Sequence, residues 1–425
     1  MARTAGRRSD ADVSETVPAR DASRDTPLAA ELREFAAFGA RTLVGEMSTD
    51  GQRVPTFTNE FWTAAQREGH SLHEVSYRAC FKPSLPAFFV ERLSRPGDVV
   101  LDPFMGRGTT VLEAVLRGRV GWGNDVNPLS AMLVAPRLSP PPFAAIRARL
   151  DELDLAYDGA VDEDLLTFFH PDTLRELYAL RAWLLARAAS GELDAADAWI
   201  RMVAVNRLTG HSPGFFSVYT MPPNQAVSVT AQRKINEKRN QSPPRRDVRA
   251  IVAKKSRALL ADCAGLWRSG CGGARSLLAT GPANDLRAFE GGSVQLVVTS
   301  PPFLDVVQYA DDNWLRCWFC GIDAQAVPIT MARTVPAWQQ AMHEVFVELR
   351  RVVRPGGWIA FEVGEVKRGT VKLEEVVVPA AAAAGLVPEL VMIHAQEFTK
   401  TANCWGIGNN RAGTNTNRIV VLRRP

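Results

Sequence analysis

Two short segments of the chain combine residue types that could do chemistry. Residues 102–110 read Asp-Pro-Phe-Met-Gly-Arg-Gly-Thr-Thr and follow the apolar run 99–101, and residues 299–303 read Thr-Ser-Pro-Pro-Phe and follow the run 294–298. Glycines let the backbone approach a ligand closely, whereas a hydroxyl and a proline carbonyl are hydrogen-bond acceptors. In an α/β sheet, ligands gather at the carboxyl ends of strands, and two such ends can be neighbours. The first segment therefore suits a cofactor, and the second suits a flat base with an amino group.

The second segment could activate such an amine. An exocyclic amine of a base is a poor nucleophile, because its lone pair is delocalised into the ring. The hydroxyl of Ser300 and the carbonyl of Pro301 could accept hydrogen bonds from the amine and favour its localised form. Pro301 and Pro302 would hold these acceptors in place, and Phe303 offers a face on which a flipped-out base can stack. The alternative is an ordinary proline turn after a buried strand.

Together, the two segments resemble those of the amino-methylating DNA methyltransferases, which transfer a methyl group from S-adenosylmethionine to an exocyclic amine of cytosine or adenine. The resemblance extends over residues 70–135 and 275–425. It implies that residues 102–110 form the cofactor loop, with Arg107 where a small residue is more usual, and that the tetrapeptide 300–303 is catalytic. The serine form of this tetrapeptide is associated mostly with cytosine N4 methylation of a base flipped out of duplex DNA. The same chemistry on adenine N6 or on RNA is one alternative, and a catalytically degenerate DNA-binding protein is another.

Residues around the cofactor loop suggest further contacts with S-adenosylmethionine. Asp125 ends the expected strand 120–125, where an acid can bind both ribose hydroxyls, although it could instead cap the following helix. The helix that starts near Thr109 would point its free N–H groups at the methionine carboxylate. Residues 81–83 resemble the family's segment over the methionine end, and Asp285 is a candidate for holding the adenine amine. We therefore expect cofactor contacts from Lys82, Pro83, Asp102, Pro103, Phe104, Gly106, Gly108, Thr109, Thr110, Asp125, Asn127 and Asp285.

Positive charge is concentrated in one segment of the chain. The whole chain has a net charge of only +4, yet residues 231–257 contain ten Lys or Arg and two acidic residues. Basic side chains clamp phosphates and, together with Asn and Gln, read the edges of bases. A solvated basic loop without a partner is the alternative interpretation. We expect contacts with double-stranded DNA from Gln232, Arg233, Lys234, Asn236, Lys238, Arg239, Arg245 and Arg246.

The six cysteines exclude some chemistries. Carbon methylation of cytosine uses a cysteine thiolate that typically follows a proline, and none of the six cysteines does so. They form no disulfide framework, and the Cys317–Cys320 pair lacks a second pair nearby, so we expect no metal site. No apolar run is long enough to cross a membrane. We therefore expect an intracellular protein, cytoplasmic and associated with the nucleoid.

The elements that must position these residues follow an α/β pattern. A strand at 99–102, a glycine turn, a helix at 109–116 and a strand at 120–125 form the first half of a Rossmann-like unit. Further elements are expected as strands at 276–279, 294–298, 358–363, 386–395 and 417–422 and a helix at 336–353. We predict a Rossmann-like methyltransferase sheet with helices on both faces and a mainly helical or irregular insertion.

Four regions are expected along the chain. Residues 1–27 lack large apolar side chains and should form a disordered tail, and residues 28–135 should hold N-terminal helices and the cofactor-binding half of the sheet. Residues 136–271 form the insertion, which we interpret as the target-recognition region. Residues 272–425 would form the catalytic half. The insertion departs from the family, whose recognition segment usually lies beside the catalytic strand or at a chain end.

Overall fold

The computed structural model describes residues 26–425, apart from residues 63–68, 78–79, 222–226, 266–274, 304–308, 330–331, 367–370 and 399–412. The expected tail, 1–27, lies outside the described residues except for its last two. Thr26 accepts a hydrogen bond from the backbone N–H of Ala29 and so caps helix α1 (Pro27–Glu34), with proline at the first helical position.

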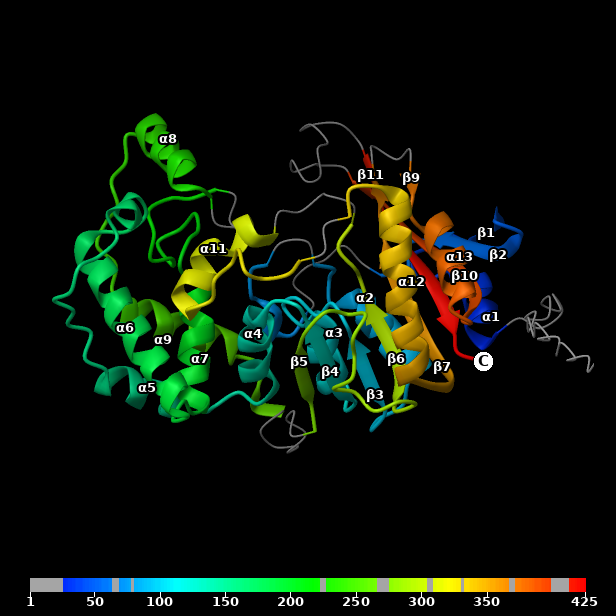
Figure 1. Cartoon of the computed structure of the whole chain (residues 1–425), viewed down its shortest axis with the longest axis horizontal. Helices are drawn as coiled ribbons and strands as arrows, with labels where there is room; N and C mark the ends of the chain where they lie inside the picture. The colour runs from blue at the N-terminus through cyan, green and yellow to red at the C-terminus, as the bar shows by residue number, and fades with distance from the viewer. Residues whose placement is uncertain are drawn as a thin grey trace, which may run out of the picture.

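The chain builds one nine-stranded sheet (Figure 1). Five of its strands are parallel neighbours, in the spatial order third, second, first, fourth and fifth along the chain, which is the order of a doubly wound Rossmann sheet. In that order they are β5 (Leu277–Thr280), β4 (Val120–Asp125), β3 (Val99–Asp102), β6 (Val294–Thr299) and β7 (Val353–Val363). The predicted Rossmann-like methyltransferase sheet is therefore confirmed.

Two long strands extend the sheet beyond β7. Strand β11 (Gly413–Arg423) lies antiparallel to β7, and β10 (Val387–Phe398) lies antiparallel to β11. As a result, β10 runs in the same direction as the five parallel strands, and its carboxyl end lies at the same edge as theirs. A short two-stranded sheet, β8 (Glu365–Val366) and β9 (Val371–Lys372), follows β7 along the chain.

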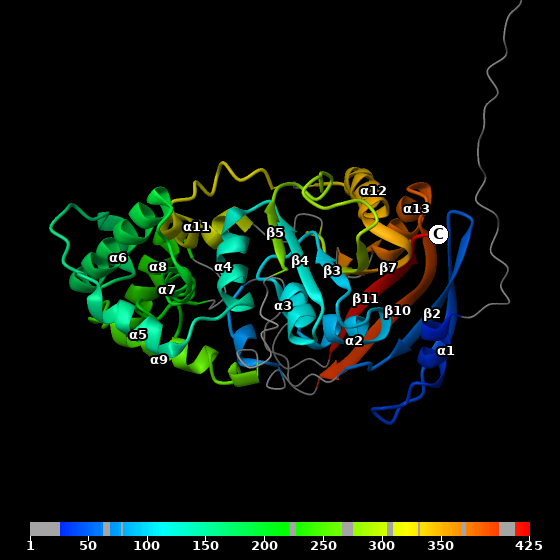
Figure 2. The ribbon, with the colours of Figure 1, turned by 90° about the horizontal axis from the view of Figure 1, so that it is seen from below.

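Helices cover both faces of the sheet because its strands are apolar on both sides (Figure 2). On β3, Val100 packs with the helices α2 (Ser84–Leu93) and α3 (Thr109–Leu116), whereas the next residue, Leu101, packs with α12 (Val335–Val352) and α13 (Glu374–Ala383). Successive side chains of a strand point to opposite faces, so continuous apolar runs are what a doubly covered sheet requires. The expectation of helices on both faces is confirmed.

The region before the cofactor loop differs from its prediction. Helices were expected at the start of residues 28–135, but β1 (Leu43–Thr49) and β2 (Gln52–Asn59) form a hairpin there that extends the sheet edge beside β10. The turn is Asp50-Gly51, with both residues at positive φ, and Asp-Gly is a strong hairpin signal. Val54 and Phe57 lie on β2 itself and are buried, so the hairpin is held by packing against the main core.

A helical body lies at the opposite end of the sheet, beyond β5 (Figure 1). The insertion supplies most of it, which agrees with its helical pattern. Helix α11 (Tyr309–Cys320) comes from the catalytic half of the chain, yet Leu315, Cys317 and Phe319 pack in the core of this body. The body therefore extends past the insertion that begins and ends at residues 136 and 271. The insertion contributes α5 (Phe143–Glu152), α6 (Pro171–Ser190), α7 (Ala195–Val205), α8 (Val229–Arg239) and α9 (Val248–Leu259), and α4 (Pro128–Leu138) joins it to β4.

Candidate functional site

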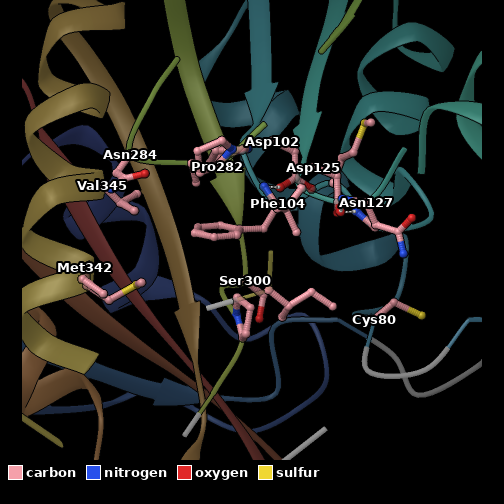
Figure 3. Close-up of a pocket in the computed structure, with 18 of the residues that line it drawn as sticks. Cys80, Asp102, Phe104, Asp125, Asn127, Pro282, Asn284, Ser300, Met342 and Val345 are labelled. Carbon is pink, nitrogen blue, oxygen red and sulfur yellow. Dashed lines mark hydrogen bonds between the residues drawn. The ribbon is translucent and has the colours of Figure 1, made fainter. Parts of the chain in front are cut away.

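The two chemically interesting segments meet at one pocket at the carboxyl ends of the parallel strands (Figure 3). The cavity measures about 200 Å³, well over ten times the space that one water occupies. It combines residues from β3, β4 and β6 that are up to about two hundred positions apart in sequence. The predicted residues that line it are Asp102, Pro103, Phe104, Gly106, Thr109, Asp125, Asn127, Ser300 and Pro302.

A buried carboxylate joins the cofactor strand to the catalytic strand. Asp102 Oδ1 accepts a hydrogen bond from Thr299 Oγ1 at 2.6 Å and from the backbone N–H of Phe104 at 3.1 Å. Burial raises the pKa of Asp102 to about 7, although these hydrogen bonds oppose the rise. Thr110 adds a second link, because its hydroxyl donates to the carbonyl of Val298 at 2.9 Å. The loop that begins at Ser300 is therefore held in a fixed position relative to the cofactor loop.

The glycine loop needs its glycines. Gly106 and Gly108 have φ angles of 47° and 76°, in the left-handed region that side chains disfavour. A Cβ on Gly108 would also lie 2.4 Å from Val134 Cγ2, so no other residue fits there without movement. Gly108 is the N-cap of α3, and this explains its importance even though it does not line the pocket.

Asp125 lies at the centre of the pocket wall and holds the glycine loop. Its two carboxylate oxygens accept hydrogen bonds from the backbone N–H groups of Gly106 and Asn127, at 2.9 and 2.8 Å. Helix α4 is capped instead by Asn127, whose Oδ1 accepts from the N–H of Leu129 at 2.9 Å. Burial raises the pKa of Asp125. Of the two interpretations of Asp125, the structure removes the helix cap, because Asn127 fills that place.

The catalytic tetrapeptide is divided between pocket and core. Ser300 and Pro302 line the pocket, and the carbonyl of Pro302 accepts a hydrogen bond from Trp338 Nε1 at 2.9 Å. Pro301 is buried, and Phe303 is partly buried. A Cβ on Gly364 would lie 3.0 Å from Phe303 Cε2, so the ring lies close against the backbone there. Ser300 and Pro302 therefore line the cavity, while the ring of Phe303 packs against the backbone at Gly364.

Glu362 belongs to the site, although no local sequence pattern indicates it. The Ser300 hydroxyl forms a hydrogen bond with the Glu362 side chain, and Asn417 Nδ2 donates to Glu362 Oε1 at 3.0 Å. Burial raises the pKa of Glu362. The residue lies on β7, next to the catalytic strand, because Thr299 pairs with Phe361 in the parallel register. Its strand was predicted, but only the pairing of that strand with β6 brings the carboxylate to Ser300.

Several expected cofactor residues do not line the pocket. Lys82 and Pro83 lie beside it, and their neighbours Tyr77, Cys80 and Phe81 form the wall instead. Thr110 is buried behind the loop, as described above.

The expectation for Asp285 is not supported. Its carboxylate is exposed and paired with Arg287 at 2.6 Å, outside the pocket. Asn284 lines the pocket, and its Nδ2 donates to Glu344 Oε2 at 2.9 Å, with Glu344 also on the wall. The turn after β5 therefore presents Asn284 to the pocket, and not Asp285 as expected.

The expectation that Gln232 and Asn236 read bases is wrong, because both side-chain amides form their hydrogen bonds within the helical body. Gln232 is fully buried, and its Nε2 donates to the carbonyl of Tyr219 at 3.0 Å and to Asn236 Oδ1 at 2.8 Å. Asn236 Nδ2 donates to the carbonyl of Thr167 at 2.8 Å. Both amides donate to backbone carbonyls of the helical body, and Gln241 Nε2 also donates to the Tyr219 carbonyl at 3.0 Å and to Asn236 Oδ1 at 2.9 Å, so these side chains are directed inward. They attach α8 to the helical body.

The basic residues of the same segment face outward. Lys234 and Lys238 are exposed on α8, and Arg239 lies over the ring of Tyr219 at 3.8 Å. Arg233 and Arg245 form exposed ion pairs with Asp164 and with Asp172 and Glu176 respectively, and the backbone of Arg246 bonds to Thr173. Figure 1 shows α8 at the top of the helical body, on the side where β11 begins. That side is the carboxyl edge of the parallel strands, since β11 runs antiparallel to β7.

Within the described residues, no helix combines the length and the apolar character needed to cross a membrane.

Comparison with known proteins finds one family model that matches part of the cofactor-binding half, and two relatives that are similar over short stretches. Residues 43–129 match the family model described as DNA methylase. The chain is 33% identical over 69 residues to the type II methyltransferase M.MjaII of Methanocaldococcus jannaschii, and 30% identical over 108 residues to the type II methyltransferase M.BsoBI of Geobacillus stearothermophilus. These matches cover 16% and 25% of this chain, and only 13% and 20% of the two relatives.

Among solved structures, a putative DNA modification methylase from Thermus thermophilus, complexed with S-adenosyl-L-methionine, is 22% identical over 34% of this chain and 53% of its own, with a TM-score of 0.21. TrmN from Thermus thermophilus is 11% identical over 84% of this chain and 52% of its own, with a TM-score of 0.31. Such low TM-scores carry no conclusion about function. The matched family model is that of a DNA methylase and the two relatives are type II methyltransferases, and these partial matches do not separate the cytosine N4 type from the adenine N6 type.

Proposed function

We propose that the protein is an S-adenosylmethionine-dependent DNA methyltransferase that methylates an exocyclic amine of a base, with cytosine N4 as its target. The observation that carries this proposal is the single pocket that both segments line, with the glycine loop and Asp125 on one side and Ser300 on the other. A cofactor held by the first and an amine held by the second would meet there. The family match over residues 43–129 supports the same reaction class.

The residues of the pocket fit S-adenosylmethionine. Asp125 lines the cavity, and its carboxylate accepts hydrogen bonds from two backbone N–H groups and from the Ser130 side chain. A carboxylate has about four acceptor positions, so capacity for a ribose hydroxyl is left. Phe104, Pro282 and Val345 provide apolar surface for an adenine ring at one end. The cofactor would supply an electrophilic methyl group on a positively charged sulfur.

Ser300 and Glu362 would prepare the amine of the target base. The Ser300 oxygen can accept a hydrogen bond from the amine while its own proton is directed to the Glu362 carboxylate. This pair strengthens the serine oxygen as an acceptor, because a hydrogen bond donated to a carboxylate increases the electron density on the donor oxygen. As the nitrogen forms its bond to the methyl carbon, it must lose one proton. Glu362, whose pKa is raised by burial, is placed to receive that proton through Ser300.

The helical body would hold the DNA. Helix α8 presents Lys234 and Lys238 on the side of the molecule at which the pocket strands end, so phosphates could lie between α8 and the pocket edge. The ion-paired Arg233 and Arg245 would have to leave their acidic partners to join them. We therefore assign the basic face of α8 to phosphate binding, and residues 136–271 as a whole to target recognition.

The target atom can be tested directly. Duplex DNA is incubated with the protein and cofactor carrying a labelled methyl group, then digested to nucleosides and analysed by mass spectrometry, with the Ser300→Ala variant as the inactive control. Labelled N4-methylcytosine supports the proposal. Labelled N6-methyladenine would keep the reaction class and overturn the choice of base, whereas no label in any nucleoside would overturn the proposal altogether.

A further inference from the structure

Arg107 places a positive charge at one end of the pocket. It lines the wall together with Cys80, Phe81 and Asn127. Burial raises the pKa of the Cys80 thiol, and Arg107 is the strongest of the charges that oppose this rise, so the guanidinium lies close to Cys80. Figure 3 shows Cys80 and Asn127 on the opposite side of the pocket from Asn284 and Val345. The cation therefore lies at the end remote from the apolar surface that suits adenine.

The charge of Arg107 is not balanced by a carboxylate. Its guanidinium donates to the carbonyl of Val75 at 2.9 Å, to those of His73 and Phe81 at 3.4 Å, and to Thr109 Oγ1 at 3.2 Å. Each of these acceptors is neutral. Across the part of the chain that the structure describes, Arg107 forms no ion pair.

A second guanidinium next to it makes the imbalance larger. Arg137 is fully buried and donates to the carbonyls of Leu133, Leu72 and Arg107. Burial, followed by the like charge of Arg107, lowers the pKa of Arg137 to about 9. The described hydrogen-bond partners of both guanidinium groups are neutral. Removing two adjacent cations from water costs free energy, and an anion bound beside them would offset that cost.

The distribution of charge in the pocket limits where an anion could bind. Asp102 and Asp125 lie in the middle of the wall, and Glu344 lies near Asn284 at the adenine end, so a carboxylate would be repelled from both places. At the Arg107 end, α3 adds unpaired backbone N–H groups that begin after Gly108. The pocket is thus positive at one end and negative elsewhere, and the cofactor of the proposed function has its only carboxylate at one end.

We propose that Arg107 binds the α-carboxylate of the cofactor's amino-acid part and thereby selects cofactors that carry this group. The assignment rests on the proposed function and extends it, because it names the cation that meets the carboxylate. The direction of the ligand is the one that the family resemblance implies, with the amino-acid part at Cys80 and Asn127 and the purine at Asn284 and Val345. It also explains why an arginine is present at a loop position where a small residue is more usual.

A purely structural role for Arg107 is the competing explanation. The arginine ties the backbone carbonyls of His73, Val75 and Phe81 to the cofactor loop, and that alone could justify its presence. Arg316 provides a matched control. It donates from α11 to the carbonyl of Ser76, in the same segment, at 3.1 Å, but it does not line the pocket. Replacing Arg316 loosens the segment without removing a cation from the cavity wall.

Calorimetry with two ligands separates these roles. S-adenosylhomocysteine carries the amino-acid part, whereas 5′-methylthioadenosine has the same nucleoside and thioether without it. We expect Arg107→Gln to weaken S-adenosylhomocysteine binding by about 10- to 100-fold, the range of a charge-assisted hydrogen bond, and to change 5′-methylthioadenosine binding by less than about threefold. Arg316→Gln should change both affinities by the same factor. An equal loss of both ligands in Arg107→Gln would overturn the proposal in favour of the structural role.

The unaltered protein gives an independent measurement if Arg107→Gln fails to fold. S-adenosylhomocysteine should bind at least about tenfold more tightly than its carboxamide, which keeps the shape and lacks the charge. Equal affinity for acid and amide would overturn the assignment while leaving the proposed function intact. Failure of the unaltered protein to bind either nucleoside ligand would instead overturn the proposed function itself.

Discussion

The carboxyl edge of the sheet and the helical body use polar side chains in opposite ways. At the edge, Asp125 and Ser300 are directed toward a shared cavity, and the buried Asp102 holds their loops together. In the helical body, the side-chain amides of the buried Gln232 and the partly buried Asn236 donate to backbone carbonyls, and the charged groups of α8 face solvent. The first arrangement is typical of a site that holds a small ligand. The second is typical of a surface that meets a large, charged partner.

This contrast has a physical origin. A parallel sheet brings the ends of several strands together, so polar residues that follow the strands converge whether or not they are close in sequence. A helix distributes its side chains around an axis, and burial of one face decides which of them point inward. Residue type alone therefore indicates function at the sheet edge, whereas on α8 it must be combined with the direction of each side chain.

The largest expected effect concerns the catalytic serine. Ser300→Ala should lower turnover by about 10²- to 10³-fold, the cost of removing one preorganised hydrogen-bonding group from an active site. Cofactor affinity should stay nearly unchanged, because Asp125 and the glycine loop remain in place. Single-turnover methylation with labelled cofactor measures the first quantity, and calorimetry the second. Unchanged turnover would remove Ser300 from the mechanism and leave the sheet edge as a binding site only.

Glu362→Gln should lower turnover by about 10- to 100-fold, the range of a hydrogen bond to a charged group. Burial raises the pKa of Glu362, so in the unaltered protein the carboxylate becomes protonated as the pH falls, and it then no longer accepts the serine proton. Activity should therefore decrease toward acid pH. The variant should lose this acidic limb of the profile. A rate–pH profile of the same shape in both proteins would contradict the proton-accepting role.

Asp125→Ala should weaken cofactor binding by about 1.5–3 kcal/mol, because hydrogen bonds to a charged acceptor are lost. DNA affinity should change little, since α8 and the helical body are separate from the cofactor loop. Calorimetry with S-adenosylhomocysteine and a DNA-binding titration make the comparison. Asp285→Ala is the matched control, because it removes a carboxylate that lies outside the pocket. Equal cofactor affinity in Asp125→Ala and the unaltered protein would exclude a ribose contact.

The salt dependence of DNA binding tests the outer face of α8. Lys234→Ala with Lys238→Ala should reduce the slope of log affinity against log salt by about 1.8, if each lysine neutralises one phosphate. The loss should be similar for all duplexes, because phosphate contacts carry no sequence information. Replacing Arg53 and Arg147 by Ala removes the same charge away from α8 and from the carboxyl edge of the sheet, and serves as the control. An unchanged slope in the α8 variant would reduce the segment to a solvated basic surface.

The sequence predicts the parallel sheet and most of the pocket because both depend on local patterns. Apolar runs define β3, β4 and β6 almost to the residue, and the glycine spacing places α3. Glu362 could not be found this way, since its role depends on the pairing of β7 with β6. The hairpin could have been predicted from the sequence, because Asp50-Gly51 is a local hairpin signal. The orientation of α8 depends on packing against residues about seventy positions away, which no local pattern records.

The smallest expected effect is a loss of stability when the buried amide of Gln232 is removed. This variant distinguishes most clearly between a side chain that holds α8 in place and one that contacts DNA. Gln232→Ala removes donors to the Tyr219 carbonyl and to Asn236, so it should lower the free energy of unfolding by about 1–3 kcal/mol. Sequence choice and the salt slope should stay the same, because the side chain does not reach DNA. Denaturant titration measures stability, and methylation of a duplex library measures sequence choice. Relaxed sequence choice without loss of stability would return Gln232 to the DNA interface, and α8 would then read bases as well as hold phosphates.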